Sequence, residues 1–232
     1  MAGISFDDVT VTAEAAGGDV VILRHVSAEL TERRVALIGG NGSGKSTLAR
    51  LINGLVSASS GVVTVDGLDV SDEGPAVRRR VGFVFTQPAA QLVMPTVAED
   101  IALSLRRLVP DKHERQQRVL SILDSYGLAH LAATSVHALS GGQQQLLALA
   151  GVLATEPSIV VADEPTTLLD LRNSVIVADR LFALEQQLVL VTHDLDLALR
   201  CERVLVIEDG AIAFDGEPAA AVDHYRRSVA TP

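Results

Sequence analysis

The chain has 232 residues, of which 48% are apolar and only 3% aromatic, and its formal net charge is −10. Hydrophobicity at this level excludes a disordered chain, and the acidic balance argues against a nucleic-acid-binding protein, whose surface would match phosphate charge. The longest apolar run, Leu146–Ala154, is well short of the roughly 20 residues that a membrane-spanning helix needs. We expect that run to be buried core within one domain of ordinary size, with room for an inserted subdomain.

Two features indicate a reducing, cytosolic compartment. Residues 1–8 carry two Asp and no basic residue, so we expect no signal peptide. The single cysteine, Cys201, excludes an internal disulfide framework and a cysteine-based metal site. We expect Cys201 to be a small buried hydrophobic residue.

The predicted elements alternate between strands and helices. Apolar, β-branched runs bounded by Gly, Pro or Asp predict buried strands, at Val35–Ile38, Val62–Val65, Val81–Phe85, Ile159–Val161, Val189–Val191 and Val204–Ile207. Helical patterns cover Ser46–Leu55, Thr96–Leu108, Asp111–Tyr126, Ser140–Thr155 and Asn173–Leu184. Such alternation implies a largely parallel sheet. The stretches Gly61–Gly67 and Gly210–Gly216 predict hairpins or turns.

The section from about Pro88 to Ala154 contains helices and no convincing strand. We therefore expect a single domain over residues 1–232, in which residues 1–87 and 155–232 form an α/β core. Residues 88–154 are expected to form a helical subdomain inserted into that core.

A glycine-rich loop follows the predicted strand Val35–Ile38 and leads into a predicted helix. Its residues, Gly39-Gly40-Asn41-Gly42-Ser43-Gly44-Lys45-Ser46, match G-x-x-x-x-G-K-[ST] in the context that this pattern requires. Glycines let successive backbone N–H groups turn inward as an anion nest, and the helix N-terminus adds its dipole. We expect this loop and Thr47 to bind the phosphates of a nucleoside triphosphate. Lys45 would reach the β- and γ-phosphates, and the hydroxyl of Ser46 would bind Mg²⁺.

Two adjacent carboxylates follow the predicted strand Ile159–Val161, at Asp163 and Glu164. Asp163, at the carboxyl end of that strand, can hold Mg²⁺ as the second half of the metal site. Glu164 is then placed to polarise an attacking water. A phosphate loop alone does not separate a kinase from an ATPase, and this pair favours hydrolysis.

The segment Leu139-Ser140-Gly141-Gly142-Gln143 opens a predicted helix and forms a second anion site. A monomer needs only one γ-phosphate site, so a second one suggests that it serves another subunit's nucleotide. With this segment the sequence resembles the ATP-binding-cassette (ABC) ATPases over nearly its whole length. The resemblance implies a P-loop NTPase (RecA-like) α/β core with an N-terminal antiparallel β-subdomain and an inserted helical subdomain, hydrolysing ATP with Mg²⁺.

The same resemblance implies roles for other residues. It implies a head-to-tail dimer in which the segment Ser140–Gln143, through Ser140 and Gly142, faces the γ-phosphate held by the opposite subunit. Leu169-Asp170 resembles the D-loop, which communicates across that dimer, and His193 resembles the switch histidine that contacts the γ-phosphate. The other histidines are expected to be structural or surface residues: His25, His113, His130, His137 and His224.

The sequence departs from the family pattern in three places. A Gln usually follows the strand that leads into the helical subdomain, but here Thr86 occupies that place and Gln87 comes one residue late. Either Gln87 reaches Mg²⁺ through a shifted loop, or the hydroxyl of Thr86 replaces it. Gln144-Gln145-Leu146 stands where basic residues are usual. An aromatic residue that stacks on adenine is missing from Val9–Gly18, where Thr12 and Ala13 occupy the aligned places.

Two runs, Val93–Asp100 after Ala90-Gln91-Leu92, and Pro165–Asn173, resemble the ATPases of energy-coupling-factor (ECF) importers. With Leu30–Arg34 and Thr86 they most resemble the biotin-transport type. This resemblance implies a pair of ATPases, identical or different, at the cytoplasmic face of the membrane, beneath a transmembrane coupling subunit and a substrate-binding membrane subunit. The coupling helices would dock around residues 86–100, and no nucleic acid is expected as a partner.

Three alternatives remain open at this point. The cargo could be cobalt or nickel, because importers of these metals use closely similar ATPases and no ATPase touches the cargo. A non-transport ABC ATPase acting on DNA or the ribosome is a second alternative, although such proteins usually carry coiled-coil insertions, a second cassette or basic surfaces. A nucleotide switch with poor hydrolysis, because of Thr86, is the third.

Overall fold

The computed structural model describes residues 3–15 and 18–230, which divide into two compact units. The first unit takes in the described parts of Met1–Val81, Ser158–Glu164 and Leu184–Pro232, and the second takes in Gly82–Pro157 and Pro165–Ala183. Two parts of the sequence discussed above lie outside the described residues: residues 1 and 2 of the N-terminal stretch 1–8, and residues 16 and 17 of Val9–Gly18. None of the helices in the described ranges has both the length and the apolar character that crossing a bilayer requires.

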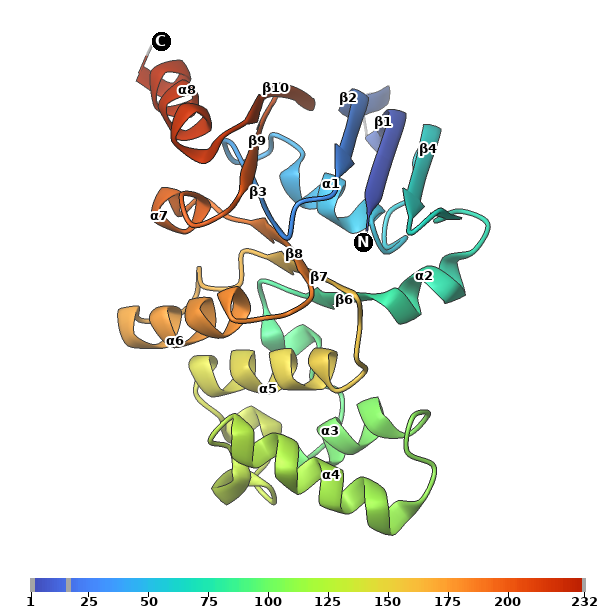
Figure 1. Cartoon of the computed structure of the whole chain (residues 1–232), viewed down its shortest axis with the longest axis vertical. Coiled ribbons are helices and arrows are strands. Elements are labelled where there is room, and N and C mark those ends of the chain that lie inside the picture. The colour runs from blue at the N-terminus through green and yellow to red at the C-terminus, as the bar shows by residue number, and fades with distance from the viewer. Residues whose placement is uncertain (1–2, 16–17, 231–232) are drawn as a thin grey trace. The chain divides into compact units, whose positions relative to one another are not determined.

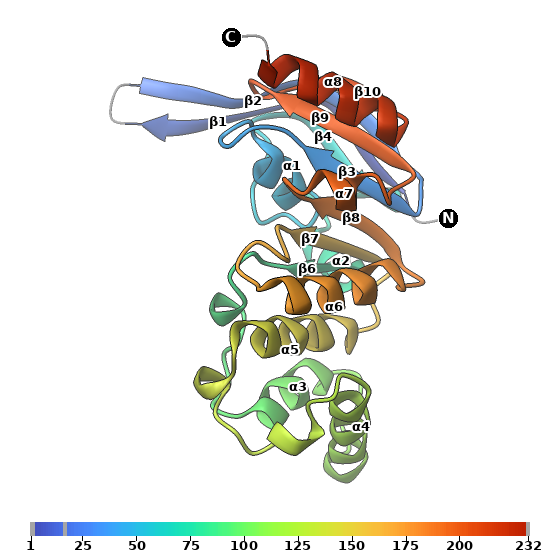
Figure 2. The same cartoon turned by 90° about the vertical axis from the view of Figure 1, so that its left-hand side faces the viewer.

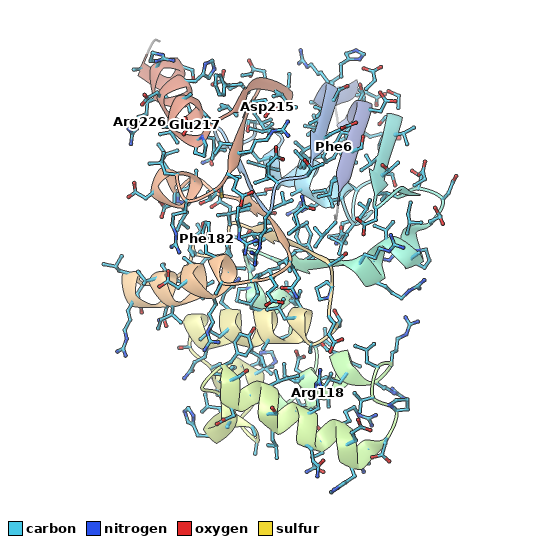
Figure 3. The ribbon with its side chains drawn as sticks, viewed as in Figure 1. Phe6, Arg118, Phe182, Asp215, Glu217 and Arg226 are labelled. Atoms are coloured by element: carbon cyan, nitrogen blue, oxygen red, sulfur yellow. The ribbon has the colours of Figure 1, made fainter. Side chains whose placement is uncertain are left out.

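An antiparallel sheet opens the first unit, in the order β2-β1-β4-β5. Its strands are β1 (Ile4–Ala15), β2 (Gly18–Leu30), β4 (Ser60–Val65) and β5 (Leu68–Asp69). The strands β1 and β2 lie side by side in Figure 2. Val62–Val65, which the alternation of strands and helices groups with a parallel sheet, therefore lies in this antiparallel one. Exposed Val62 and buried Val63 follow one another in β4, and such alternation is typical of a strand with one solvated face. Phe6, on β1 (Figure 3), is buried.

The second sheet of the first unit carries the phosphate loop. Its strands run in the order β10-β9-β3-β8-β7, where β3 (Arg34–Ile38), β7 (Ile159–Asp163), β8 (Gln187–Val191) and β9 (Arg203–Glu208) are parallel. The strand β10 (Ala211–Gly216) closes it as an antiparallel hairpin with β9. Every residue of β3, β7 and β8 is buried, as expected for a parallel sheet covered on both faces. The α/β fold class is thereby confirmed.

The helices of the first unit are α1 (Lys45–Leu51), α2 (Gly74–Arg80), α7 (Leu195–Ala198) and α8 (Pro218–Ala230). The prediction for α1 extends too far, because Gly54 has a φ of +70° and Asn53 accepts a hydrogen bond from the backbone of Leu55 in a turn. The other three helices were not predicted. Pro75 and three arginines obscure apolar periodicity in α2, α7 is a single turn, and the start of α8 is a run of alanines.

The second unit contains α3 (Val97–Leu105), α4 (Lys112–Ser125), α5 (Gly141–Leu153) and α6 (Leu171–Phe182), with short 3₁₀ turns at Pro88–Ala90, Ala129–Leu131 and Val136–Ala138. The chain passes from the first unit to the second along β6 (Val81–Val84). Within the second unit α5 lies between α6 and the pair α3–α4 (Figure 1). Its residues Leu147–Val152 are buried, so the expectation that this run is core is confirmed. Side chains cap all four helices, those of Thr96, Asp111, Ser140 and Asp170.

Candidate nucleotide-binding and catalytic site

The phosphate loop joins β3 to α1, and its glycines hold backbone conformations that other residues rarely adopt. Gly39, Gly42 and Gly44 have φ angles of +145°, +77° and +103°. A Cβ at Gly39 would lie 2.1 Å from the carbonyl oxygen of Ile207, and one at Gly44 would lie 2.7 Å from Leu23 Cδ2. Glycine is therefore needed at Gly39 and Gly44 for space as well as for conformation.

The β9–β10 turn supports this loop from outside. Gly210 donates its backbone N–H to the carbonyl of Ser43 at 3.1 Å, and its own carbonyl accepts from the backbone of Arg24 in β2 at 2.8 Å. Gly210 therefore links the loop by hydrogen bonds to strands of both sheets of the first unit.

Lys45 is buried, with an exposed fraction of 7%, and its ammonium group lies inside the loop. Nζ donates to the carbonyl oxygens of Gly39 at 2.9 Å and Gly40 at 2.7 Å. Burial lowers the pKa of Lys45, while the carboxylates of Glu164 and Asp163 act in the opposite direction. A buried cation with hydrogen-bonding neighbours is a group that phosphate oxygens can recruit.

The loop has the chemistry that a triphosphate requires. Ser43 Oγ is buried and has no hydrogen-bond partner among the described residues, and an unpaired buried hydroxyl is unusual without a ligand. Asn41 and Gly40 are exposed, and Thr47 is half-buried on the first turn of α1. The residues predicted to hold phosphates thus form one loop and the first turn of α1, because they are consecutive in the sequence. Their roles toward a nucleotide stay predictions.

Ser46 and Asp163 meet at the end of β7. Ser46 Oγ donates to Asp163 Oδ1 at 2.8 Å, and Arg50 Nη2 lies 3.4 Å from Oδ2. Asp163 is only 1% exposed, and this burial raises its pKa, against the smaller lowering by Ser46 and Arg50. A hydroxyl beside a carboxylate is an oxygen donor set that suits Mg²⁺, which keeps several of its waters. Motif matching did not identify Arg50 as a neighbour of this pair.

Glu164 and His193 form a second side-chain pair in the first unit, after Ser46 and Asp163. Glu164 has a φ of +51°, a left-handed conformation that is costly for a residue with a side chain. Its backbone N–H donates to the carbonyl of Val191 at 2.9 Å, which holds this conformation. His193 Nδ1 lies 2.7 Å from Glu164 Oε2. The carboxylate is mostly buried and the imidazole 60% exposed, so the pair presents an orienting histidine beside a general-base candidate.

The segment Leu139–Gln143, which we call the signature segment, and Asp170 lie together in the second unit. Ser140 caps α5 in a reciprocal arrangement, in which Gln143 N donates to Ser140 Oγ and Ser140 N donates to Gln143 Oε1. Gly141 is exposed and Gly142 is buried against Asn173 of α6. Asp170 in turn caps α6. Sequence reasoning included Asn173 in the run Pro165–Asn173 but gave it no role at this site.

Gln87 lies in the second unit, exposed, at the start of the Pro88–Ala90 turn, and Thr86 before it is half-buried. The assignment of Gln87 as a metal ligand stays a prediction. The backbone before it is held by side-chain amides. Gln91 donates to the carbonyl of Phe83 and accepts from Phe85 N, and buried Gln145 donates to the carbonyl of Phe85.

The aligned adenine-stacking places carry no ring. Thr12 is exposed and bonds to Ser59, and Ala13 is half-buried. An aromatic residue does reach the neighbourhood of the loop from α8, which the sequence did not predict. Tyr225 lines a cavity of about 330 Å³ together with Gly40–Ser43 and the Glu208–Asp209 turn.

The remaining expectations concern residues outside these groups. Cys201 is buried, as expected for a small hydrophobic residue, and this burial raises the pKa of its thiol to about 12. His25, His113, His130 and His137 are exposed, and His224 is half-buried with its ring near that of Phe214.

Comparison with known proteins identifies the family. The ABC transporter family model matches residues 23–167. An ABC transporter ATP-binding protein of Bartonella henselae is 46% identical over 224 residues, covering 97% of each chain, and its name states no cargo. The biotin transport ATP-binding protein BioM of Rhizobium etli is 42% identical over 225 residues, covering 96% of this chain and all of BioM.

The fold agrees with solved structures of ATP-binding cassettes. The cassette MJ0796, solved as a dimer in a post-hydrolysis state bound to ADP and Pi, superposes with a TM-score of 0.83 at 31% identity. The superposition covers 93% of this chain and 98% of MJ0796. On the family match, the relatives and the phosphate loop together, the chain belongs to the ABC transporter family and is one of its ATPases.

Proposed function

We propose that the chain is the ATP-hydrolysing subunit of an ECF-type importer and powers the uptake of a vitamin, biotin. The observation that carries this proposal is the 42% identity to BioM, which extends over 96% of this chain. The runs Val93–Asp100 and Pro165–Asn173 support it through their resemblance to ECF ATPases. In this proposal the chain is a peripheral subunit at the cytoplasmic face of the membrane. It pairs with a second ATPase, and a coupling subunit docks around residues 86–100.

Hydrolysis follows from the groups of the first unit. Ser46 and Asp163 would hold Mg²⁺, which when bound neutralises charge on the phosphates and helps to orient them. Lys45 gives up its loop carbonyls to stabilise the β- and γ-phosphates. Glu164 accepts a proton from the attacking water, and His193 holds the Glu164 carboxylate at 2.7 Å in the orientation that this transfer needs.

Transport requires that hydrolysis at one subunit be felt by another. In the proposed dimer, Ser140, Gly141, Gly142 and Gln143 of one subunit face the γ-phosphate bound to the phosphate loop of the other, and Asp170 lies at the same interface. Loss of the γ-phosphate then removes contacts between subunits, and the opening passes to the membrane subunits.

Uptake of radiolabelled biotin in cells that lack this chain tests the proposal. We expect uptake to be lost, to return with the wild-type chain, and to remain absent with Glu164→Gln, which keeps size and hydrogen-bonding capacity but removes the base. Radiolabelled cobalt and nickel form the parallel arm. Uptake of either metal that depends on this chain, with biotin uptake unaffected, contradicts the biotin assignment. Unchanged uptake of all three contradicts the assignment of biotin and of both metals as the cargo.

A further inference from the structure

Asn173, on the first turn of α6, binds both carboxylate oxygens of Asp170. Its backbone N–H donates to Asp170 Oδ1 at 2.8 Å, and its Nδ2 donates to Asp170 Oδ2 at 2.9 Å. The first bond is a helix cap that any residue at this position could make. The second depends on the carboxamide, and a hydrogen bond to a carboxylate is among the stronger ones in proteins.

The same carboxamide also lies against Gly142 of the Leu139–Gln143 segment. A Cβ added to Gly142 would lie 2.3 Å from Asn173 Cγ, 2.5 Å from Oδ1 and 2.8 Å from Nδ2. Real Cβ atoms essentially never approach so closely. The start of α5 and the start of α6 are therefore separated here by the thickness of one side chain.

The neighbouring backbone is also fixed. Ser174 Oγ donates to the carbonyls of Thr166 at 3.3 Å and Leu169 at 3.4 Å. A Cβ at Gly141 would meet Leu169 Cδ2 at 3.8 Å. The segment that ends in Asp170 is thus hydrogen-bonded to α6, and the first turn of α6 packs against Gly142 through Asn173.

We propose that Asn173 is a positioning residue that couples Asp170 to the Gly141–Gly142 turn, so that these two elements move as one piece. The proposal rests on the proposed function, in which both elements face the nucleotide of the opposite subunit. A displacement of Asp170 by the partner is then transmitted to Gly142 through the half-buried side chain of Asn173, and the reverse. Asn173 therefore acts on the active site that contains the partner's phosphate loop, in trans.

The chemistry of the position accounts for an asparagine. Aspartate has the same shape but would place a second carboxylate against Asp170 and remove the donor. Alanine would open the space beside Gly142 and remove the bond. We therefore expect Asn173→Asp and Asn173→Ala both to uncouple the two elements, the first by charge and the second by volume.

The first experiment compares these variants with Gln116→Glu, an amide-to-carboxylate change at an exposed position of α4. ATP affinity of the single chain, which depends on the phosphate loop, should stay within about twofold for all three. ATP-driven dimerisation in a Glu164→Gln background should weaken by about threefold to fivefold for the two Asn173 variants, because the lost bond lies within one subunit and is exposed to solvent. Gln116→Glu should dimerise like the parent.

The second experiment uses mixed dimers in which one subunit carries Lys45→Ala, so that only the other subunit's phosphate loop is active. Asn173→Ala in the Lys45→Ala subunit should lower turnover by about threefold to fivefold. The same change in the other subunit should leave it within about twofold. A structural defect would not distinguish the two arrangements, so equal turnover in both overturns the role of Asn173.

The outcomes separate the two proposals. If no chain dimerises with ATP or hydrolyses it, the composite site of the proposed function is wrong, and the inference about Asn173 fails with it. If the parent dimerises and the Asn173 variants match it, the inference alone fails. Asn173→Asp keeps the volume of the side chain, so it serves as the test should Asn173→Ala fail to fold.

Discussion

Two adjacent glycines of the phosphate loop should respond very differently to the same substitution. In Gly39→Ala the new Cβ would lie 2.1 Å from the carbonyl oxygen of Ile207, and the alanine backbone would have to adopt a φ of +145°. A Cβ at Gly40, by contrast, would meet no atom within 4 Å. Ile207 belongs to β9, which is hydrogen-bonded between β10 and β3 and is buried at its centre. The clashing atom is therefore backbone that has little room to move.

The size of the effect follows from these contacts. A side chain in left-handed backbone costs about 1–2 kcal/mol, and forcing an extra methyl group into a packed region costs about 1–3 kcal/mol. We expect Gly39→Ala to lower the free energy of unfolding by about 2–5 kcal/mol. Gly40→Ala should change it by no more than about 1 kcal/mol, because alanine there mainly reduces the entropy of the unfolded chain.

Urea denaturation of the nucleotide-free chain, followed by circular dichroism, measures this difference. Without nucleotide, the result does not depend on what either glycine does toward phosphates. The midpoint should fall for Gly39→Ala with an unchanged m-value, since a change in slope would indicate a different unfolding reaction. Equal midpoints for the two variants would refute the reasoning from Cβ geometry.

Three further predictions concern chemistry. Glu164→Gln should slow phosphate release by about 100-fold or more while ATP still binds, because the proton acceptor is lost, and turnover near the wild-type rate would exclude Glu164 as the base. Burial raises the pKa of Cys201 from 9.0 to about 12, so above pH 9 the unfolded chain loses a proton that the folded chain retains. Stability should therefore fall as pH rises from 9.0 to about 12, by about 1.4 kcal/mol per pH unit from this group, and Cys201→Ala should reduce that slope in urea titrations at several pH values. Because Thr12 and Ala13 provide no ring for adenine, kcat/KM for ATP and GTP should agree within about tenfold, and a preference for ATP above about 100-fold contradicts this.

Motifs that are contiguous in sequence were predictable from sequence. The phosphate loop and the Asp163–Glu164 pair each occupy a strand end. The predicted roles, backbone anion binding and metal coordination, would restrict which residues can stand there. The strands β3, β7 and β8 were predictable for a related reason, since a parallel strand buried on both faces is a continuous apolar run.

Contacts between segments distant in sequence were not predictable. Asn173 lies against Gly142, and Arg50 lies beside Asp163, because of how helices pack and how a strand ends. Asn173 closes the run Pro165–Asn173, but that resemblance carries no signal for its contact with Gly142. The left-handed backbone of Glu164 has no sequence signal either, because glutamate is not a residue that favours it. The helices α2, α7 and α8 were missed where apolar periodicity is short or interrupted by arginines and alanines.

The hydrogen bonds that Lys45 makes to Gly39 and Gly40 have a consequence for affinity. The loop supplies its own lysine with two acceptors, so these carbonyls would compete with any phosphate for Lys45. A triphosphate that recruits Lys45 must replace two hydrogen bonds, each worth about 1 kcal/mol, which weakens net binding by about tenfold or more. In the proposed cycle the same bonds would re-form as the product leaves and would favour its release, which repeated turnover needs as much as it needs binding.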